Sequence, residues 1–227
     1  MVDAAADPQA LYRLLSWLSP SYPVGAFSYS HGLEYAVETG TVGDLDSLTA
    51  WTETVLLRGT GRIDGVLFRE AYCAVEADDA DALDEIRELG NAFQATAEFA
   101  LESRAQGDAF VRATRSAWPV PALDRLADGA VYPVAVAVGC AGHGIPVEVG
   151  LHGYFHAFSA NLVSAGVRLI PLGQTDGQRA VAALAAAVER AQQNAMNIPL
   201  EDLGAAAPVL DLASMHHETQ YTRLFRS

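Results

Sequence analysis

Apolar residues recur at intervals of three and four along most of the chain, and strict alternation of apolar and polar residues is nearly absent. This spacing places apolar side chains on one face of an α-helix. The first helix is expected after Asp7 and Pro8, because an aspartate cap followed by proline suits a helix N-terminus. Its apolar face would carry Leu11, Leu14, Leu15 and Leu18. The hydrophobic pattern therefore predicts a helical protein.

Glycine, proline and aspartate divide the rest of the chain into further helical segments. Two short apolar runs, 131–138 and 168–172, could instead be strands, but longer helical patterns flank each of them. The expected fold is therefore all-α, a single compact domain of about ten helices over residues 1–227. The further helices are expected at about 28–38, after Asp44, and at 63–77, 81–93, 95–116, 121–128, 133–142, 147–169 and 176–196.

The composition is acidic and contains no lysine. Asp and Glu number 28 against 14 basic residues, which are all Arg, and the formal net charge is −14. An acidic surface repels phosphate groups and anionic lipid headgroups, so neither nucleic acid nor a membrane surface is an expected partner. Without lysine the chain has no Walker A loop to hold nucleotide phosphates. If a nucleoside triphosphate is involved, another subunit should bind it.

The N-terminal residues and the cysteines favour a cytoplasmic location. The first residues carry acid where a signal peptide needs a basic region followed by an apolar run. No stretch of sequence reaches the roughly 18 uninterrupted apolar residues of a membrane span. Cys73 and Cys140 lie in apolar, helical-looking segments, where a free cysteine is most often buried. We therefore expect a reducing, cytoplasmic compartment.

His152 and His156 stand four residues apart in the helix expected at 147–169, so they share one face with Glu148. This spacing can hold a divalent metal. A small helical metal-dependent enzyme, with Glu148 or Asp176 as the carboxylate ligand, is therefore the alternative function. The pattern fixes no third ligand, however, and a structural or surface role for the two histidines is favoured.

Residues 19–34, SPSYPVGAFSYSHGLE, are dense in turn-forming residues within a helical context. Phe27 could pack against the following helix, and Ser28 or Ser30 could cap it. Gly32 inside a helix would cost up to about 1 kcal/mol relative to alanine, which suggests that another backbone comes close there. That backbone could belong to a partner protein or to another helix of the same chain, and the sequence does not decide between them.

Three stretches resemble the urease accessory protein UreF family, in the same order along the chain. They are residues 15–34 (LSWLSPSYPVGAFSYSHGLE), 168–178 (RLIPLGQTDGQ) and 215–227 (MHHETQYTRLFRS). The resemblance extends over essentially the whole chain, because the length and the helical pattern also agree. It implies an all-α homodimer that works in nickel insertion into apo-urease and is not an enzyme.

The resemblance also implies partners. Members of the family bind a second accessory protein, UreD (also called UreH), and together they recruit and regulate the GTPase UreG. The absence of lysine agrees with this division of work, because the GTPase would supply the phosphate-binding lysine. No resident cofactor is expected on this chain, since the complex handles nickel and no nickel site is evident in the sequence.

The C-terminal residues 215–227 have an unusual composition for a chain end. Tyr221, Leu224 and Phe225 are apolar and lie beside Arg223 and Arg226 in an otherwise polar stretch. Aromatic and arginine side chains dominate many protein interfaces. We expect this segment, like residues 1–7, to be loosely ordered in the free protein and to become ordered on a UreD-type partner; docking of Leu224 and Phe225 on the chain's own core is the alternative.

The predicted partner-binding residues come from the first and third motifs. They are Pro20, Gly25, Phe27, Ser28, Ser30, Gly32, Glu34, His217, Glu218, Thr219, Gln220, Tyr221, Arg223, Leu224, Phe225 and Arg226.

Overall fold

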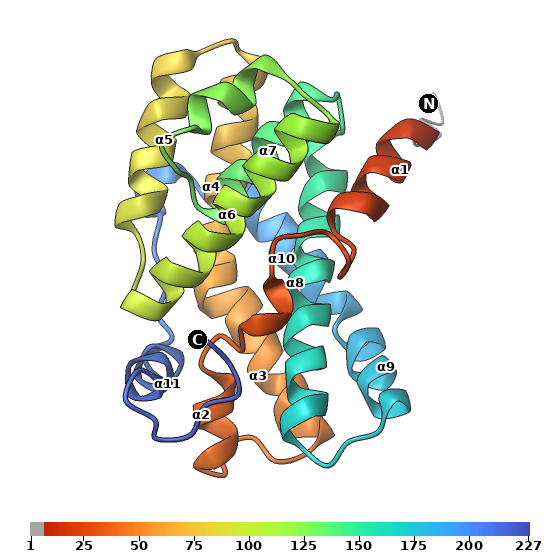
Figure 1. The fold of residues 1–227 in the computed structure, drawn as a ribbon, viewed down its shortest axis with the longest axis vertical. Coiled ribbons are helices and arrows are strands. Elements are labelled where there is room, and N and C mark those ends of the chain that lie inside the picture. The colour runs from red at the N-terminus through yellow and green to blue at the C-terminus, as the bar shows by residue number, and fades with distance from the viewer. Residues whose placement is uncertain (1–6) are drawn as a thin grey trace.

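A computed structural model describes residues 7–227, and Figure 1 shows that helices make up almost all of this part of the chain. The expected all-α class is confirmed, and the described residues contain no strand. The α-helices are α1 (Pro8–Trp17), α2 (Leu33–Glu38), α3 (Leu45–Arg58), α4 (Thr60–Glu76), α5 (Ala80–Ala92), α6 (Ala97–Ala117), α7 (Tyr132–Gly142), α8 (Val147–Leu169), α9 (Gln174–Ala183), α10 (Ala185–Asn197) and α11 (Pro208–His217). Three short 3-10 helices, η1 (Ala26–Ser28), η2 (Pro121–Leu126) and η3 (Leu200–Asp202), lie between them.

Local sequence signals account for several helix boundaries. Asp7 caps α1, because its side chain accepts a hydrogen bond from the backbone N–H of Gln9, and proline occupies the first helical position. α8 occupies the residues expected for it, 147–169. Neither possible strand is present: residues 132–138 belong to α7, residues 168 and 169 end α8, and residues 170–172 lie in the connection to α9. Residues 1–6, part of the terminus expected to be flexible, lie outside the described residues.

Three expected helices differ from the structure. The segment 28–38 is helical only at Ser28, in η1, and from Leu33, because His31 and Gly32 adopt positive φ values of 57° and 76° that an α-helix cannot contain. The segment 176–196 is divided at Leu184 into α9 and α10. The helix expected at 121–128 is the 3-10 helix η2.

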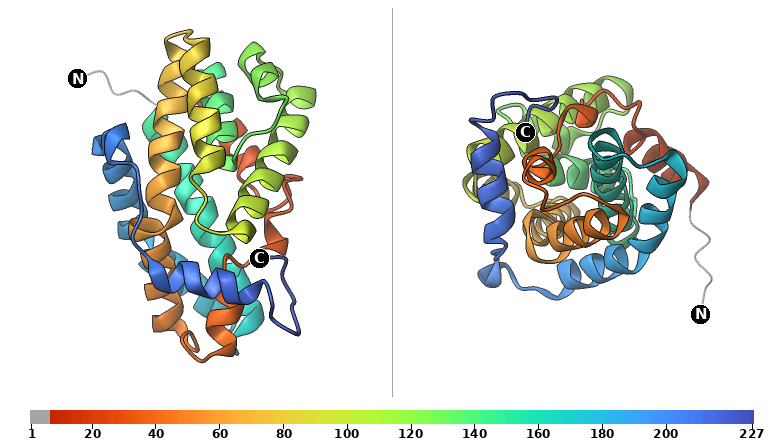
Figure 2. Two further views of the ribbon diagram at one scale, coloured as in Figure 1. Left: turned by 90° about the vertical axis from the view of Figure 1, so that its left-hand side faces the viewer. Right: turned by 90° about the horizontal axis from the view of Figure 1, so that it is seen from below.

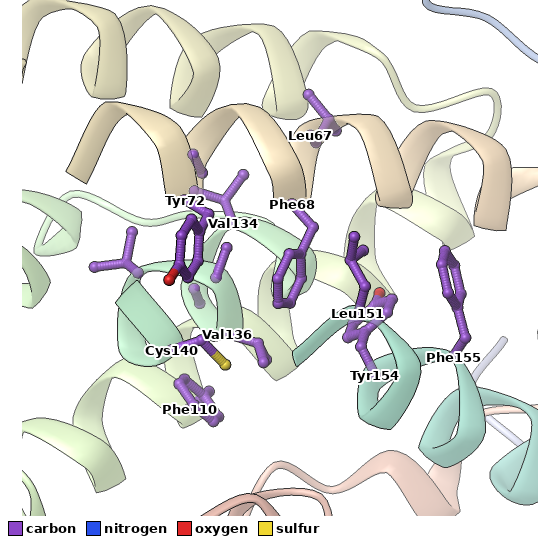
Figure 3. Close-up of a cluster of buried hydrophobic side chains, with 14 of the residues drawn as sticks. Leu67, Phe68, Tyr72, Phe110, Val134, Val136, Cys140, Leu151, Tyr154 and Phe155 are labelled. Atoms are coloured by element: carbon purple, nitrogen blue, oxygen red, sulfur yellow. The ribbon is translucent and has the colours of Figure 1, made fainter. Parts of the chain in front are cut away.

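The main hydrophobic core surrounds α7. Its residues from Val134 to Val138 are fully buried, which is why this helix is apolar all round rather than on one face. Figure 3 shows how Phe68 of α4 and Tyr154 of α8 reach this core from neighbouring helices. Cys140 lies in it as expected, whereas Cys73 on α4 is exposed, and both thiols are free.

A second, smaller core lies at the end of the molecule where α2, α3 and α8 meet. It contains Leu33, Leu48 and Leu162, and it also contains Leu210 of α11 and Phe225 from the C-terminal segment. Figure 2 shows α11 running across the other helices, with the C-terminal segment returning to the side of α2. The two ends of the described sequence therefore differ: α1 lies at the edge of the molecule, whereas residues 208–227 help to build this second core (Figure 1).

No helix within residues 7–227 is both long enough and apolar enough to cross a membrane.

Candidate functional site

The three sequence motifs meet at Arg168, the first residue of the second motif. Its guanidinium donates a hydrogen bond of 2.8 Å to the carbonyl oxygen of Phe27, in the first motif. The same guanidinium lies 4.4 Å from the centre of the Phe225 ring, in the third motif. Segments that are far apart in sequence thus form one site at the end of the molecule that contains α2 and α11.

A buried histidine connects the first and third motifs. His217, at the end of α11, has no exposed surface; its Nε2 lies 3.0 Å from a Glu34 carboxylate oxygen, and its Nδ1 lies 2.8 Å from one of Glu98. A neutral imidazole has only one N–H, so both contacts are hydrogen bonds only if the ring is doubly protonated or one carboxyl holds a proton. Burial raises the pKa of Glu98, while the hydrogen bond from His217 opposes that shift.

Glu34 also holds the backbone of the C-terminal segment. Its two carboxylate oxygens accept hydrogen bonds from the backbone N–H groups of Leu224, at 2.6 Å, and Phe225, at 2.9 Å. Arg223 adds an ion pair of 2.9 Å to Glu98. One buried acid therefore binds both His217 and the chain that follows it, as charge-assisted hydrogen bonds that are stronger than neutral ones.

Residues 28–30 pair with the last residues of the chain. The backbone N–H of Ser30 donates to the carbonyl oxygen of Ser227 at 2.7 Å, and the Ser30 hydroxyl donates to the same oxygen at 2.6 Å. The backbone N–H of Arg226 donates to the carbonyl oxygen of Ser28 at 2.8 Å. Ser30 is not the expected cap, because the N-cap of α2 is Gly32, but its hydroxyl oxygen accepts a hydrogen bond of 3.3 Å from the backbone N–H of Glu34.

Gly32 lies where another segment of the same chain comes close. A Cβ at this position would lie 3.1 Å from the backbone nitrogen of Ser214 in α11. Gly32 precedes α2 instead of lying inside a helix, and its φ of 76° favours glycine. The approach suggested by the sequence is therefore an internal contact between α11 and the start of α2. Gly25 has a similar φ, 74°, but nothing lies near the position of its missing Cβ.

The C-terminal segment is described in one packed arrangement, which differs from the loosely ordered segment expected at 215–227. The alternative, docking on the chain's own core, holds for Phe225, which is 4% exposed, but not for Leu224, which is 64% exposed. Tyr221 is also fully exposed. Phe27 does not pack on the next helix as expected, because its side chain is exposed. Pro20, Glu218, Thr219 and Arg226 are exposed as well, and the partly buried Gln220 donates a hydrogen bond to Glu38.

Two glutamates of the site, Glu98 and Glu102, escaped the analysis of the sequence. Both lie on α6 and are 5% exposed. Glu102 accepts hydrogen bonds from the hydroxyl of Ser227, at 2.7 Å, and contacts His31 Nδ1 at 3.2 Å. Their spacing of four, continued by the buried Gln106, places them on one helix face. The sequence feature that could have indicated this buried polar face is the row of Glu98, Glu102 and Gln106, spaced by four and lying beside the apolar Phe99.

The possible metal ligands do not form a complete set. Glu148, His152 and His156 border one groove between α8 and α1, and His152 lies 3.4 Å from the side chain of Gln192. Asp176 binds the N-terminus of its own helix and Arg179. Within residues 7–227, no group of three or more His, Cys, Asp or Glu side chains is arranged to hold a metal ion.

Known proteins resemble this chain along nearly its whole length. The UreF family model matches residues 42–185. The urease accessory protein UreF of Granulibacter bethesdensis is 55% identical over 222 residues, which cover 96% of this chain and 94% of that protein. UreF of Rhodopseudomonas palustris strain BisB5 is 51% identical over 228 residues (99% and 94%), and UreF of Bradyrhizobium sp. strain BTAi1 is 51% identical over 224 residues (97% and 93%). This chain belongs to the UreF family of urease accessory proteins.

Proposed function

We propose that this protein acts without enzymatic activity of its own as a scaffold in the insertion of nickel into apo-urease. In this proposal it binds a UreD/UreH-type accessory protein and recruits and regulates a UreG-type GTPase. Nickel is the cargo of the whole complex. The lysine-free sequence supports this assignment, since the chain has no Walker A lysine and the GTPase would bring one. The free thiols of Cys73 and Cys140 agree with action in the cytoplasm.

The observation that carries the proposal is an exposed apolar surface on α11 and the segment after it. Val209, Leu212 and Met215 are spaced by three on one face of α11, and all are exposed; Leu224 and Tyr221 are exposed in the segment that follows. We call these five residues the α11 surface. Exposed apolar and aromatic side chains on one helix and on the segment that follows it favour an interaction site. We assign the UreD-type partner to the α11 surface.

A homodimer would use a different surface. Leu11, Tyr12 and Leu15 of α1 are exposed, and α1 lies at the edge of the molecule away from α11 (Figure 1). These residues form the other exposed apolar group on a single described helix. We therefore assign the second copy of the chain to α1.

Two variants separate these assignments and serve as controls for each other. Leu212→Glu places a charge on the α11 surface, and Leu15→Glu places one on α1; both side chains are exposed, so the fold should tolerate both. The proteins are co-expressed with the cognate urease accessory proteins and analysed by size-exclusion chromatography with light scattering. Leu212→Glu should lose the UreD-type protein and remain a dimer, whereas Leu15→Glu should become a monomer. Retention of the UreD-type protein by Leu212→Glu would contradict the assignment of the α11 surface.

A further inference from the structure

A cavity of about 280 Å³ lies between the loop after α1, α4, α6 and α8. Its outer rim includes the exposed residues Pro20, Phe27 and His156, and its inner end includes the buried residues Asp64 and Glu102. Ligand pockets commonly measure about 300–1,000 Å³, so this cavity suits a group about the size of one side chain.

The inner end of the cavity carries two carboxyl groups and no fixed positive charge. Asp64 is 9% exposed, and its Oδ2 accepts a hydrogen bond of 2.7 Å from the hydroxyl of Tyr154. No arginine is among the described residues that line the cavity, and the chain contains no lysine. A buried carboxyl without a positive partner is costly, because burial disfavours its charged form. Consistent with this, burial raises the pKa of Asp64 to about 6.

His31 does not supply the missing charge in its neutral form. Its Nδ1 lies 3.2 Å from Glu102, and its Nε2 lies 2.8 Å from the hydroxyl of Thr60. If Nδ1–H donates to Glu102 and Thr60 donates to Nε2, both ring nitrogens are satisfied without a second proton. Asp64 and Glu102 then face the cavity with no cation between them.

Aromatic rings form much of the remaining wall. A positive charge is attracted to the face of an aromatic ring, and organic cations are commonly held by aromatic side chains together with a carboxylate. A metal ion would need several ligating side chains, and within residues 7–227 no group of three is arranged to provide them. The aromatic residues that line the cavity are Trp17, Tyr22, Phe27, Phe99, Tyr132, Tyr154 and Phe158, and the Phe99 ring is stacked on the His31 ring.

We propose that this cavity binds a single organic cation, a primary ammonium or guanidinium group, with Asp64 as its principal counter-charge. Such a group would be held by the Asp64 carboxylate and by the aromatic walls. It could belong to a free small molecule or to a lysine or arginine side chain of a partner protein, and the chemistry of recognition is the same in both cases.

The test uses the full chain and two probes, n-butylammonium and methylguanidinium, titrated at constant ionic strength and followed by NMR. At least one probe should bind saturably at pH 7.5, whereas the uncharged analogues 1-butanol and N-methylurea should not.

Asp64→Asn keeps an oxygen for the Tyr154 hydroxyl and should weaken binding about tenfold or more, as expected for loss of a charged hydrogen bond. Asp128→Asn, the same change at an exposed position, should have no effect. Ala160→Phe, at the half-buried rim, should block entry of the probe while leaving Asp64 in place.

The pH dependence gives a further check. The other titratable groups that line the cavity are Tyr22, His31, Glu102, Tyr132, Tyr154 and His156. Protonation of Asp64 would reduce the attraction for a cation. Probe binding should therefore weaken as the pH falls through about 6.

Several outcomes would overturn the proposal: no saturable binding of either probe, equal binding of the uncharged analogues, or unchanged affinity in Asp64→Asn. The source of the group is decided separately with the complex co-expressed for the scaffold experiment. If a partner's side chain fills the cavity, Asp64→Asn should weaken the complex; if a free small molecule fills it, the complex should be unchanged. Loss of the scaffold function would leave the probe titration unaffected, so failures of the two proposals can be told apart.

Discussion

His217 Nε2 lies 3.0 Å from a carboxylate oxygen of Glu34, a residue 183 positions earlier in the chain, and both side chains are buried. The same Glu34 carboxylate accepts hydrogen bonds from the backbone of Leu224 and Phe225. The contact therefore ties α11 and the C-terminal segment to the start of α2. The contact also fixes the position of the α11 surface, because α11 ends at His217 and the backbone of Leu224 is bound to Glu34.

Removing the histidine from this contact should destabilise the protein strongly. His217→Ala would remove the imidazole hydrogen bonds of two buried carboxyl groups, Glu34 and Glu98, and each buried polar group left without its partner costs about 1–3 kcal/mol. The free energy of unfolding in urea measures the loss. The neighbouring His216 is exposed, and His216→Ala should cost less than about 1 kcal/mol. Similar losses in the two variants would show that the buried contact contributes little.

The glycine preceding α2 can be tested against a second glycine with the same backbone conformation. Gly32→Ala and Gly25→Ala both place a side chain at a positive φ, 76° and 74°, which costs about 1–2 kcal/mol. Only at Gly32 would the new Cβ also approach the backbone of Ser214, at 3.1 Å. Gly32→Ala should therefore lower the free energy of unfolding more than Gly25→Ala. Equal losses of stability in the two variants would show that α11 moves away from the new side chain at no cost in free energy.

Two adjacent residues near the C-terminus should behave differently. Phe225 is buried in the second core, so Phe225→Ala should destabilise the protein by about 3–5 kcal/mol. Leu224 is largely exposed, so Leu224→Ala should leave the melting temperature nearly unchanged but weaken the complex with the UreD-type protein. Thermal unfolding and co-purification measure the two effects. A large loss of stability in Leu224→Ala would show that this residue serves the fold and not the partner.

Asp64 should make the folded protein less stable as the pH rises. Its pKa is about 6 in the folded state and 3.8 for an ordinary aspartate, so the folded state holds the proton to higher pH than the unfolded state does. Stability is then lost between about pH 4 and pH 6, by up to about 3 kcal/mol. Asp64→Asn removes this titration and should be more stable than the natural protein at pH 7, but not below pH 4. An Asp64→Asn variant that is less stable at pH 7 would contradict this prediction.

Local patterns in the sequence predicted most helices but not the site. The aspartate cap before α1 and the apolar face of α8 are local signals, and both helices begin where those signals place them. The gap between η1 and α2 depends on the positive φ of His31, a conformation that a non-glycine residue adopts only because the surrounding structure holds it there. Nothing in the local pattern predicts that conformation.

The buried acids were missed for a different reason. Acidic residues on a helix usually face water, so nothing in the sequence singled out Glu98 and Glu102 as buried. They are buried because the C-terminal segment, more than a hundred residues later, covers them and supplies His217, Arg223 and Ser227 as partners. A pairing over such a separation leaves no periodic signal in the sequence.

The proposed role in nickel insertion is tested most directly by the nickel content of urease. Urease is purified from cells that lack this protein and from the same cells supplied with the natural chain, Leu212→Glu or His216→Ala, and nickel is measured per active site. We expect the natural chain and His216→Ala to restore nickel, and Leu212→Glu, although folded and present at the same level, to leave urease largely empty. Urease that is fully loaded with nickel in the absence of this protein would contradict the proposed function.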